Sequence, residues 1–287
     1  MNLLLRISLL DYAKIIWGSM ETKNESHSKK QSRACEARII ARDGVLQELA
    51  VEIPAEHVVH VMVNNQPAMV LTCTPSNIVE LAVGRLFTEG LIGGADDIAS
   101  VDLCERSSRV YVALRKQNVT FATRNVEQVN TCESNTKNFV QGQYDAMTLK
   151  FGAKIEIDSE RIFRMADSFA NDTPLHHSTL GVHSCSLFDG PDQLYNFEDI
   201  GRHNAFDKAI GAALIDDIDL SELAVFSSGR IPVDMIAKAM RASISLLVTK
   251  ATPTTQAVAI ARGCGLTLIG RARPDSFYIF SGGQALT

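Results

Sequence analysis

Residues 223–270 read LAVFSSGRIPVDMIAKAMRASISLLVTKATPTTQAVAIARGCGLTLIG, and this stretch decides the fold. Short apolar runs alternate here with helical patterns: the runs lie at 223–226, 246–248 and 266–269, and the helices at 233–242 and 254–262. Apolar runs this short between amphipathic helices are typical of buried parallel strands. We therefore predict an α/β sheet with helical crossovers, extended by a last strand at 277–280.

A loop containing Lys or Arg follows each of these strands, and the loops are 227–230, 249–252 and 271–276. In open α/β sheets, ligands bind beyond the carboxyl ends of the parallel strands. Arginine forks, hydroxyls and backbone N–H groups that converge there are what a phosphate-rich ligand requires. The alternative interpretation is that these are ordinary solvated loop charges.

Composition excludes several classes of protein. The chain is 46% hydrophobic and 21% charged, as in ordinary globular proteins, with a net charge of −5 from 28 basic and 33 acidic residues. A general nucleic-acid coat requires the opposite sign, so no nucleic-acid partner is expected. No apolar run approaches the ~20 residues of a membrane span, so no membrane association is expected either. The six cysteines contain no CxxC pair, which indicates a reducing, cytoplasmic compartment.

The pattern divides the chain into four parts. Residues 1–35 are polar and aperiodic after a short charged apolar stretch, which predicts a disordered tail, with Met20 as an alternative start. Residues 36–124 read as a small α+β subdomain. Residues 125–150 lack any period and predict a mobile loop carrying Cys132, and residues 151–287 form the α/β domain.

Residues typical of turns and helix caps predict the strands and the helix of the small subdomain. A strand at 58–63 is followed by the turn pair Asn64-Asn65 and by a second strand. The dipeptide Thr74-Pro75 predicts a capped helix whose apolar face ends before Gly90.

The start of a helix predicted at 204–214 carries further candidates. Arg202 and His203 stand at its N-terminal end, where anions are favoured. His203 and Asp207 are four residues apart, so the carboxylate is predicted to fix the imidazole tautomer. The alternative is an ordinary capped helix with a surface ion pair. His183 lies in the sequence TLGVHSC at 179–185, which predicts a tight turn near a ligand, or else a core histidine.

The run EDIGRHNAFDK at 198–208 resembles the signature of the FdhD family of formate dehydrogenase accessory sulfurtransferases. The likeness continues through further short motifs, which are TP at 74–75, TEG at 88–90, GVHS at 181–184, SGR at 228–230, PT at 253–254 and LTLIG at 266–270. It extends from about residue 37 to the C-terminus.

This resemblance implies a fold and a role. The C-terminal domain is expected to be a cytidine deaminase-like three-layer αβα unit, and the protein a homodimer. Family members carry sulfur from a cysteine desulfurase to the molybdenum cofactor, bis-molybdopterin guanine dinucleotide, before that cofactor enters formate dehydrogenase. No permanently bound metal is expected. By resemblance the nucleotide is held by residues 271–276, which are Arg271, Ala272, Arg273, Pro274, Asp275 and Ser276. From their own sequence context, His183, Arg202 and His203 are further candidates for lining the pocket.

The family carries sulfur as a persulfide on a cysteine in a mobile loop, normally in a CxxC motif. Here the corresponding run is NTCESN at 130–135, so Cys132 is the expected persulfide carrier and Asn135 replaces the second cysteine. A single accessible thiolate is enough for a carrier, although Glu133 is expected to raise its pKa slightly. A cofactor chaperone without sulfur transfer is therefore the rival interpretation. A zinc-dependent deaminase is a weaker one, because the required His-x-Glu and Pro-Cys-x-x-Cys are missing.

Overall fold

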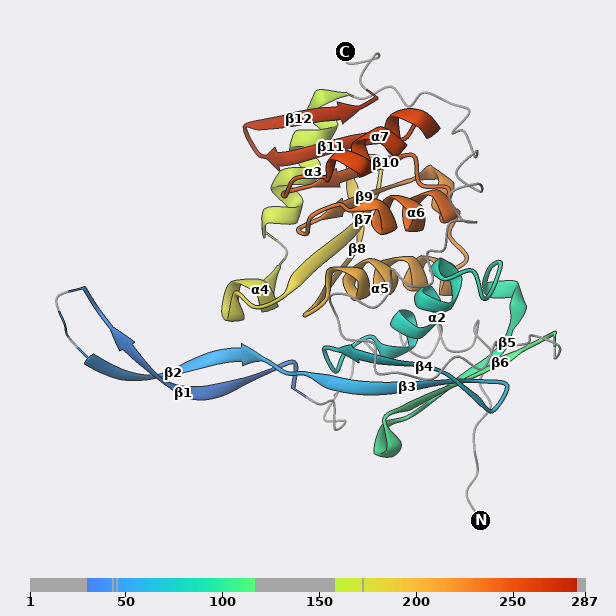
Figure 1. The fold of residues 1–287 in the computed structure, drawn as a ribbon, viewed down its shortest axis with the longest axis horizontal. Helices are drawn as coiled ribbons and strands as arrows, with labels where there is room; N and C mark the ends of the chain where they lie inside the picture. The colour runs from blue at the N-terminus through green and yellow to red at the C-terminus, as the bar shows by residue number, and fades with distance from the viewer. Residues whose placement is uncertain (1–29, 43, 45, 117–157, 172, 283–287) are drawn as a thin grey trace.

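The computed structural model describes residues 30–42, 44, 46–116, 158–171 and 173–282. Figure 1 shows a long two-stranded arm, a smaller unit containing β3–β6 and α2, and a larger unit containing β7–β12. The tail before residue 30 and the predicted Cys132 loop lie outside the described residues.

The larger unit is built on a six-stranded sheet with the strand order β12-β11-β10-β9-β7-β8. Its strands are β7 (His183–Asp189), β8 (Asp192–Asp199), β9 (Leu223–Ser227), β10 (Leu246–Thr249), β11 (Thr267–Arg273) and β12 (Ser276–Ser281). Strands β9, β10 and β11 are parallel neighbours, which confirms the parallel core predicted from the three apolar runs. The other three strands pair antiparallel, and the sequence analysis did not identify β7 and β8 as strands.

Helices cover both faces of this sheet, so the unit has three layers, α/β/α (Figure 1). One face is packed by α3 (Ser159–Asn171), and the other by α5 (Arg202–Ile215), α6 (Val233–Arg241) and α7 (Thr255–Cys264). Alternating strand residues supply the two cores: Ala224 and Phe226 face α3, and Val225 faces the three-helix layer. A short helix, α4 (Pro174–Thr179), precedes β7.

The smaller unit combines an α-helix with a four-stranded sheet, whereas residues 36–54, which the prediction included in the same subdomain, lie in the arm. Its sheet has the order β4-β3-β6-β5, and its elements are β3 (His57–Val63), β4 (Gln66–Cys73), α2 (Ile78–Thr88), β5 (Ile98–Cys104) and β6 (Arg109–Leu114). Asn64 and Asn65 both have positive φ, as a tight hairpin turn requires. The prediction that Thr74 caps the helix is wrong: α2 begins after Asn77, and the Thr74 hydroxyl donates instead to the Asp199 carboxylate at 3.0 Å.

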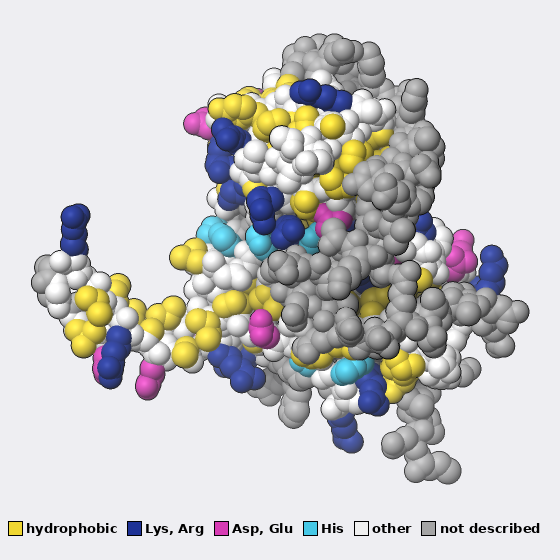
Figure 2. All heavy atoms as spheres, viewed as in Figure 1, with side chains coloured by type: hydrophobic (Ala, Val, Ile, Leu, Met, Phe, Trp, Pro, Cys, Tyr) yellow, Lys and Arg dark blue, Asp and Glu magenta, His cyan; other side chains and the backbone are white. Residues whose placement is uncertain are grey.

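Strands β1 (Ser32–Ile40) and β2 (Leu46–Pro54) form the arm, which extends away from both units (Figure 1). The prediction of a tail up to residue 35 is therefore wrong for residues 32–35, which pair with β2. The register sets Cys35 against Val51 and Ala37 against Leu49 on one face, and such cross-strand pairs stabilise a hairpin. Both sides stay solvent-exposed, and Figure 2 shows hydrophobic side chains along the arm.

The two units meet where α2 crosses α5, and glycines allow the close approach. A Cβ added at Gly84 would lie 1.8 Å from the carbonyl oxygen of Asp207, and one at Gly211 would lie 1.9 Å from that of Glu80. Beside this crossing, the buried Asp207 carboxylate contacts Lys238 Nζ and Arg85 Nε, each at 2.7 Å. The crossing therefore joins α2, α5 and α6 through backbone contact and buried charge.

Candidate functional site

The three basic loops lie side by side at one edge of the sheet, as the parallel strand order predicts. The Lys250 N–H donates to the Ser227 carbonyl at 3.0 Å, and the Thr249 hydroxyl donates to the Gly229 carbonyl at 2.7 Å. The Arg271 N–H donates to the Ala251 carbonyl at 2.8 Å, which ties the third loop to the second. We call this edge, made of residues 227–230, 249–252 and 271–276, the basic rim.

Residues 271–276 form a strand-to-strand hairpin, so the prediction of a plain loop is wrong here. Arg271, Ala272 and Arg273 still belong to β11, and Ser276 already belongs to β12. The cause is that β12 folds back antiparallel on β11, with register shifts at Leu268/Ile269 and between Gly270 and Arg273. Arg271 takes a φ of 51° beside the second shift, which is uncommon for a residue with a side chain.

Five of the six predicted ligand residues in this hairpin are exposed to solvent, and Ala272 is buried. Arg273 donates from Nη1 to the Lys250 carbonyl at 2.8 Å, and the Arg271 guanidinium lies 5.2 Å from the Tyr278 ring centroid. Pro274 and Asp275 are exposed at the turn. The Ala272 side chain is 1% exposed and packs in the core on the α3 face, so only its backbone is available to a ligand.

Lys250 adds a cation at the centre of the rim. Its Nζ lies 5.7 Å from the centroid of the Phe169 ring on α3, a cation–π distance. Burial lowers the pKa of Lys250, and the nearby charge of Arg273 lowers it further. Two cations that repel each other this way favour an anion between them. On the face drawn in Figure 2, Lys and Arg side chains run down the side of the larger unit toward a group of histidines.

A second group of polar side chains lies at the start of α5. The Ser228 Oγ accepts the Ser184 N–H at 2.9 Å and lies 3.3 Å from His183 Nδ1. His183 is the first residue of β7, so the prediction of a turn at this residue is wrong. It still lies at the rim, because β7 pairs with β9 and the rim loop 227–230 follows the end of β9. Burial lowers the pKa of His183, and the charge of Arg202 is the next cause.

His203 does not pair with Asp207, so that prediction is wrong. The His203 Nε2 lies 3.3 Å from Oδ2 of Asp234 on α6, and its side chain is 3% exposed. Burial and the charge of Lys238 hold the pKa of His203 far below its ordinary range, so the imidazole is neutral. Asp207 faces the other way because the cations on α2 and α6 hold it.

Three other polar residues of the 198–208 run, Asp199, Asn204 and Lys208, lie at the contact with the smaller unit. Lys208 Nζ lies 2.7 Å from Asp199 Oδ2, with both side chains fully buried. The Asn204 amide donates to the Thr72 carbonyl at 2.8 Å and to Asp199 Oδ1 at 2.9 Å. These residues hold the two units together, whereas Glu198, Arg202 and His203 of the same run lie toward the rim.

Two carboxylates near the rim were missed by the sequence analysis. Asp234 lies in the first turn of α6, and Glu198 accepts the N–H groups of Leu175 and His176 at 2.8 and 2.7 Å. Their positions depend on helix α4 and on the packing of α6 against α5, neither of which has a local sequence signal.

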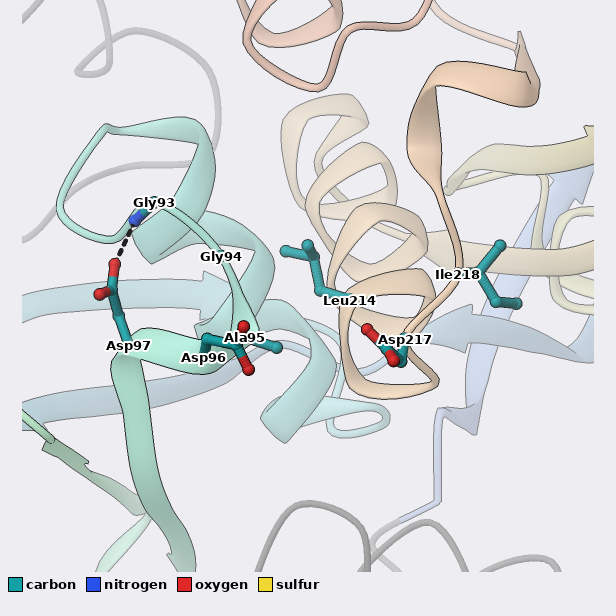
Figure 3. A pocket seen from close by; sticks show the side chains of 8 residues that line it. All are labelled: Gly93, Gly94, Ala95, Asp96, Asp97, Leu214, Asp217 and Ile218. Atoms are coloured by element: carbon teal, nitrogen blue, oxygen red, sulfur yellow. Dashed lines mark hydrogen bonds between the residues drawn. The ribbon is translucent and has the colours of Figure 1, made fainter.

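A hollow of about 420 Å³ lies elsewhere, between the segment before β5 and the end of α5. Figure 3 shows the carboxylates of Asp96 and Asp217 at its sides, while the Asp97 carboxylate accepts the Gly93 N–H at 2.6 Å. An acidic lining repels anions. It also lies at the opposite end of α5 from Arg202, so the hollow is separate from the basic rim.

Within the described residues, no group of three or more His, Cys, Asp or Glu side chains is arranged to hold a metal ion. Over the same residues, none of the helices has the length and apolar character needed to cross a membrane.

A three-layer α/β unit with cations gathered at the carboxyl ends of its parallel strands defines a class of protein suited to anionic ligands. The model of the FdhD/NarQ family matches residues 54–287, so the chain belongs to the FdhD/NarQ family.

Relatives and a solved structure agree with this assignment. The chain is 29% identical over 249 residues to the Sulfur carrier protein FdhD of Listeria innocua, covering 85% of this chain and 95% of that one. It is 30% identical over 241 residues to the Sulfur carrier protein FdhD of Bacillus pumilus, covering 82% and 90%. A crystal structure from Desulfotalea psychrophila, described as a formate dehydrogenase accessory protein, superposes with a TM-score of 0.74 at 22% identity, covering 90% of this chain and all of that one. The likeness shows a shared mixed α/β fold.

Proposed function

We propose that this protein is a sulfur carrier that serves formate dehydrogenase. It takes sulfur from a cysteine desulfurase and delivers it to the molybdenum cofactor, bis-molybdopterin guanine dinucleotide, before that cofactor is inserted into the enzyme. The name shared by the relatives supports the carrier role. The observation that supports this choice of ligand is the basic rim, where three loops of an acidic protein place Lys and Arg side chains together.

Cys132 is the proposed carrier, and it lies outside the described residues. Its thiolate attacks the outer sulfur of the desulfurase persulfide. One sulfur–sulfur bond forms as the other breaks, and the desulfurase cysteine leaves as a thiolate. Cys132 then holds a persulfide. When the outer sulfur passes to the cofactor at the sulfide level, Cys132 returns to a thiolate, and two small-molecule thiols supply the two electrons and leave as a disulfide. In this sense the protein is a sulfurtransferase.

Most described cysteines are poor rivals for this role. Burial raises the pKa of Cys73 to about 12 and that of Cys185 still further, so neither is a thiolate near neutral pH. Burial also raises the pKa of Cys264. Cys104 is different, because hydrogen bonds from Ser107 lower its pKa at the surface. Cys104 is therefore the matched control for Cys132.

The rim is proposed to hold the guanine dinucleotide ends of the cargo. Arg271, Arg273 and Lys250 supply charge-assisted donors for pyrophosphate oxygens. Asp275 and Ser276 lie at the turn beside them, with the Ser276 hydroxyl donating to the Asp275 carboxylate at 3.0 Å. The protein contributes binding and positioning, and the cofactor contributes the metal chemistry.

Three further features belong to the same proposal. The larger unit is proposed to share the cytidine deaminase architecture beyond its three layers. The protein is proposed to work as a homodimer, and in the cytoplasm. A size measurement in solution tests the homodimer directly.

A mass measurement tests the carrier role. The protein is incubated with a cysteine desulfurase and cysteine, then digested without reductant. A carrier gains about 32 Da, one sulfur atom, on the Cys132 peptide. Cys132→Ser removes the gain and Cys104→Ser keeps it. A gain that follows Cys104 instead, or no gain at all, contradicts the assignment.

Asn135 in place of a second cysteine favours one alternative, a cofactor chaperone that has lost sulfur transfer. In that case the Cys132 peptide gains no mass, while the protein still binds guanine nucleotide. The mass measurement on the Cys132 peptide and a measurement of guanine nucleotide binding therefore separate the chaperone from the carrier.

A further inference from the structure

Two cationic side chains near the start of α5 make no direct ion pair within the described chain. Arg202 is the first residue of α5 and Arg230 follows β9 in the rim. Neither forms an ion pair with any residue of the described chain, and the buried Nε of Arg202 has no hydrogen-bond partner there. Buried donors are almost always satisfied, so an unpaired guanidinium nitrogen points to a missing acceptor.

These cations converge on one place. A Cβ at Gly229 would lie 2.9 Å from the Cβ of Arg202 and 3.0 Å from its Cδ, so the glycine lets the rim loop pack on the arginine stem. The charges of Arg202 and Arg230 both act on His183. Ser228, two residues before Arg230 in the same rim loop, lies beside His183 and accepts the Ser184 N–H.

The backbone of α5 adds to this positive field. The helix has fourteen residues, and its N-cap, Gly201, has no side chain to cap the first-turn N–H groups. The first turn of α5, which lies wholly within the described residues, contains no acidic residue. The N-terminus of such a helix favours an anion.

The nearby carboxylates are already engaged. Asp234 accepts the Met235 N–H at 2.9 Å and contacts His203, and burial raises its pKa. Glu198 accepts the backbone N–H groups at the start of α4, and Asp199 is paired with Lys208. None of them neutralises Arg202 or Arg230 by direct contact.

We propose that Arg202, Arg230, His183 and Ser228 form an oxyanion subsite that binds one phosphate group, separate from the Arg271–Arg273 hairpin. Its ligand is tetrahedral and carries two negative charges, because two guanidinium groups, a hydroxyl and an imidazole surround it. The identity of that phosphate as part of the guanine dinucleotide cargo rests on the proposed function. The subsite itself rests on the contacts of Arg202, Ser228 and His183 and on the position of Arg230 two residues after Ser228.

Calorimetric titration with sulfate tests the subsite, since sulfate is tetrahedral and keeps its double charge at neutral pH. Wild type is compared with Arg202→Gln and with the matched control Arg164→Gln, an exposed arginine on α3. Loss of a charge-assisted contact is expected to weaken sulfate binding about tenfold or more in Arg202→Gln, and the control is expected to match wild type. Arg230→Gln is expected to weaken sulfate in the same direction. Because Arg230 is exposed, this second variant keeps the test valid if Arg202→Gln fails to fold.

Titration with guanosine diphosphate separates the two sources of phosphate. If sulfate competes with the nucleotide, the subsite binds the nucleotide's own phosphate, and if both bind together it binds a free oxyanion. Both results support the subsite. Sulfate affinity that is the same in Arg202→Gln, Arg230→Gln and Arg164→Gln overturns it. If the Cys132 persulfide does not form but sulfate binding still depends on Arg202, the proposed function fails while the subsite stands.

Discussion

Asp207→Asn tests whether buried charge joins the two units. The Asp207 side chain is fully buried, and its carboxylate contacts Lys238 and Arg85 at 2.7 Å and accepts the Thr88 hydroxyl at 2.8 Å. Asparagine keeps the shape but removes the charge, and it presents an NH₂ group to cations. Glu89, 3.4 Å from Arg85, compensates one of the two cations.

One buried positive charge is then left uncompensated, which costs about 3–5 kcal/mol of unfolding free energy. With a urea m-value of about 3 kcal/mol per molar, the unfolding midpoint falls by about 1–2 M. The measurement is urea unfolding followed by far-ultraviolet circular dichroism. Asp217→Asn is the control, because this exposed residue has a positive φ that asparagine tolerates, and its expected change is within about 0.5 kcal/mol.

The stability of Asp207→Asn is also expected to depend on pH. Burial lowers the pKa of Lys238 below its ordinary value of 10.5, and Asp207 opposes that shift. Without Asp207 the folded-state pKa falls further, so above it the unfolded chain binds more protons than the folded chain. The stability of Asp207→Asn therefore rises with pH up to about the ordinary lysine pKa, more steeply than that of Asp217→Asn. A midpoint equal to that of the control, or a loss without this slope, would refute the reasoning.

Two further predictions concern the rim. Arg273→Ala is expected to weaken binding of guanosine diphosphate by about 1.5–3 kcal/mol, roughly ten- to 150-fold, whereas calorimetry on Arg164→Ala should match wild type. Sulfate affinity is expected to rise as the pH falls from 8 to 5.5, because burial and Arg202 lower the pKa of free His183 and a bound anion raises it. His183→Gln is expected to flatten this pH profile. The charges of Arg230, His176 and Asp199 still act at this position in the variant. If the slope of sulfate affinity against pH is unchanged, His183 is not the group that titrates.

The parallel core could be predicted from sequence because its signal is local. Each of β9, β10 and β11 is a short apolar run between amphipathic helices, and the loops after them must share an edge. Strands β7 and β8 gave no such signal. They are rich in Ser, Asn, Gln and acidic residues, and they pair antiparallel with each other and, through β7, with β9. Their strand character depends on partners rather than on their own pattern.

The side-chain pairings within the site could not be predicted for a related reason. The spacing of His203 and Asp207 is compatible with one helix face, but spacing alone does not show what packs on that face. The partner of Asp207 is Arg85, more than a hundred positions earlier in the chain, and the partner of His203 is Asp234 on the next helix. Long-range cations and burial decided these contacts, and neither can be read from a local pattern.

Residues 198–208 therefore contribute both to the junction between the two units and to the rim. The charged side chains at the junction determine the charge state of a residue at the rim. Lys238 and Arg85, which hold Asp207 at the junction of the units, also help to keep the pKa of His203 far below its ordinary range. His203 consequently stays neutral, with its Nε2 3.3 Å from Asp234 Oδ2, and it brings no charge to the rim. An anion at the start of α5 must then be held by Arg202 and Arg230, with His183 adding charge only when it gains a proton. The assembly of the two units thus sets which residues at the rim are cations.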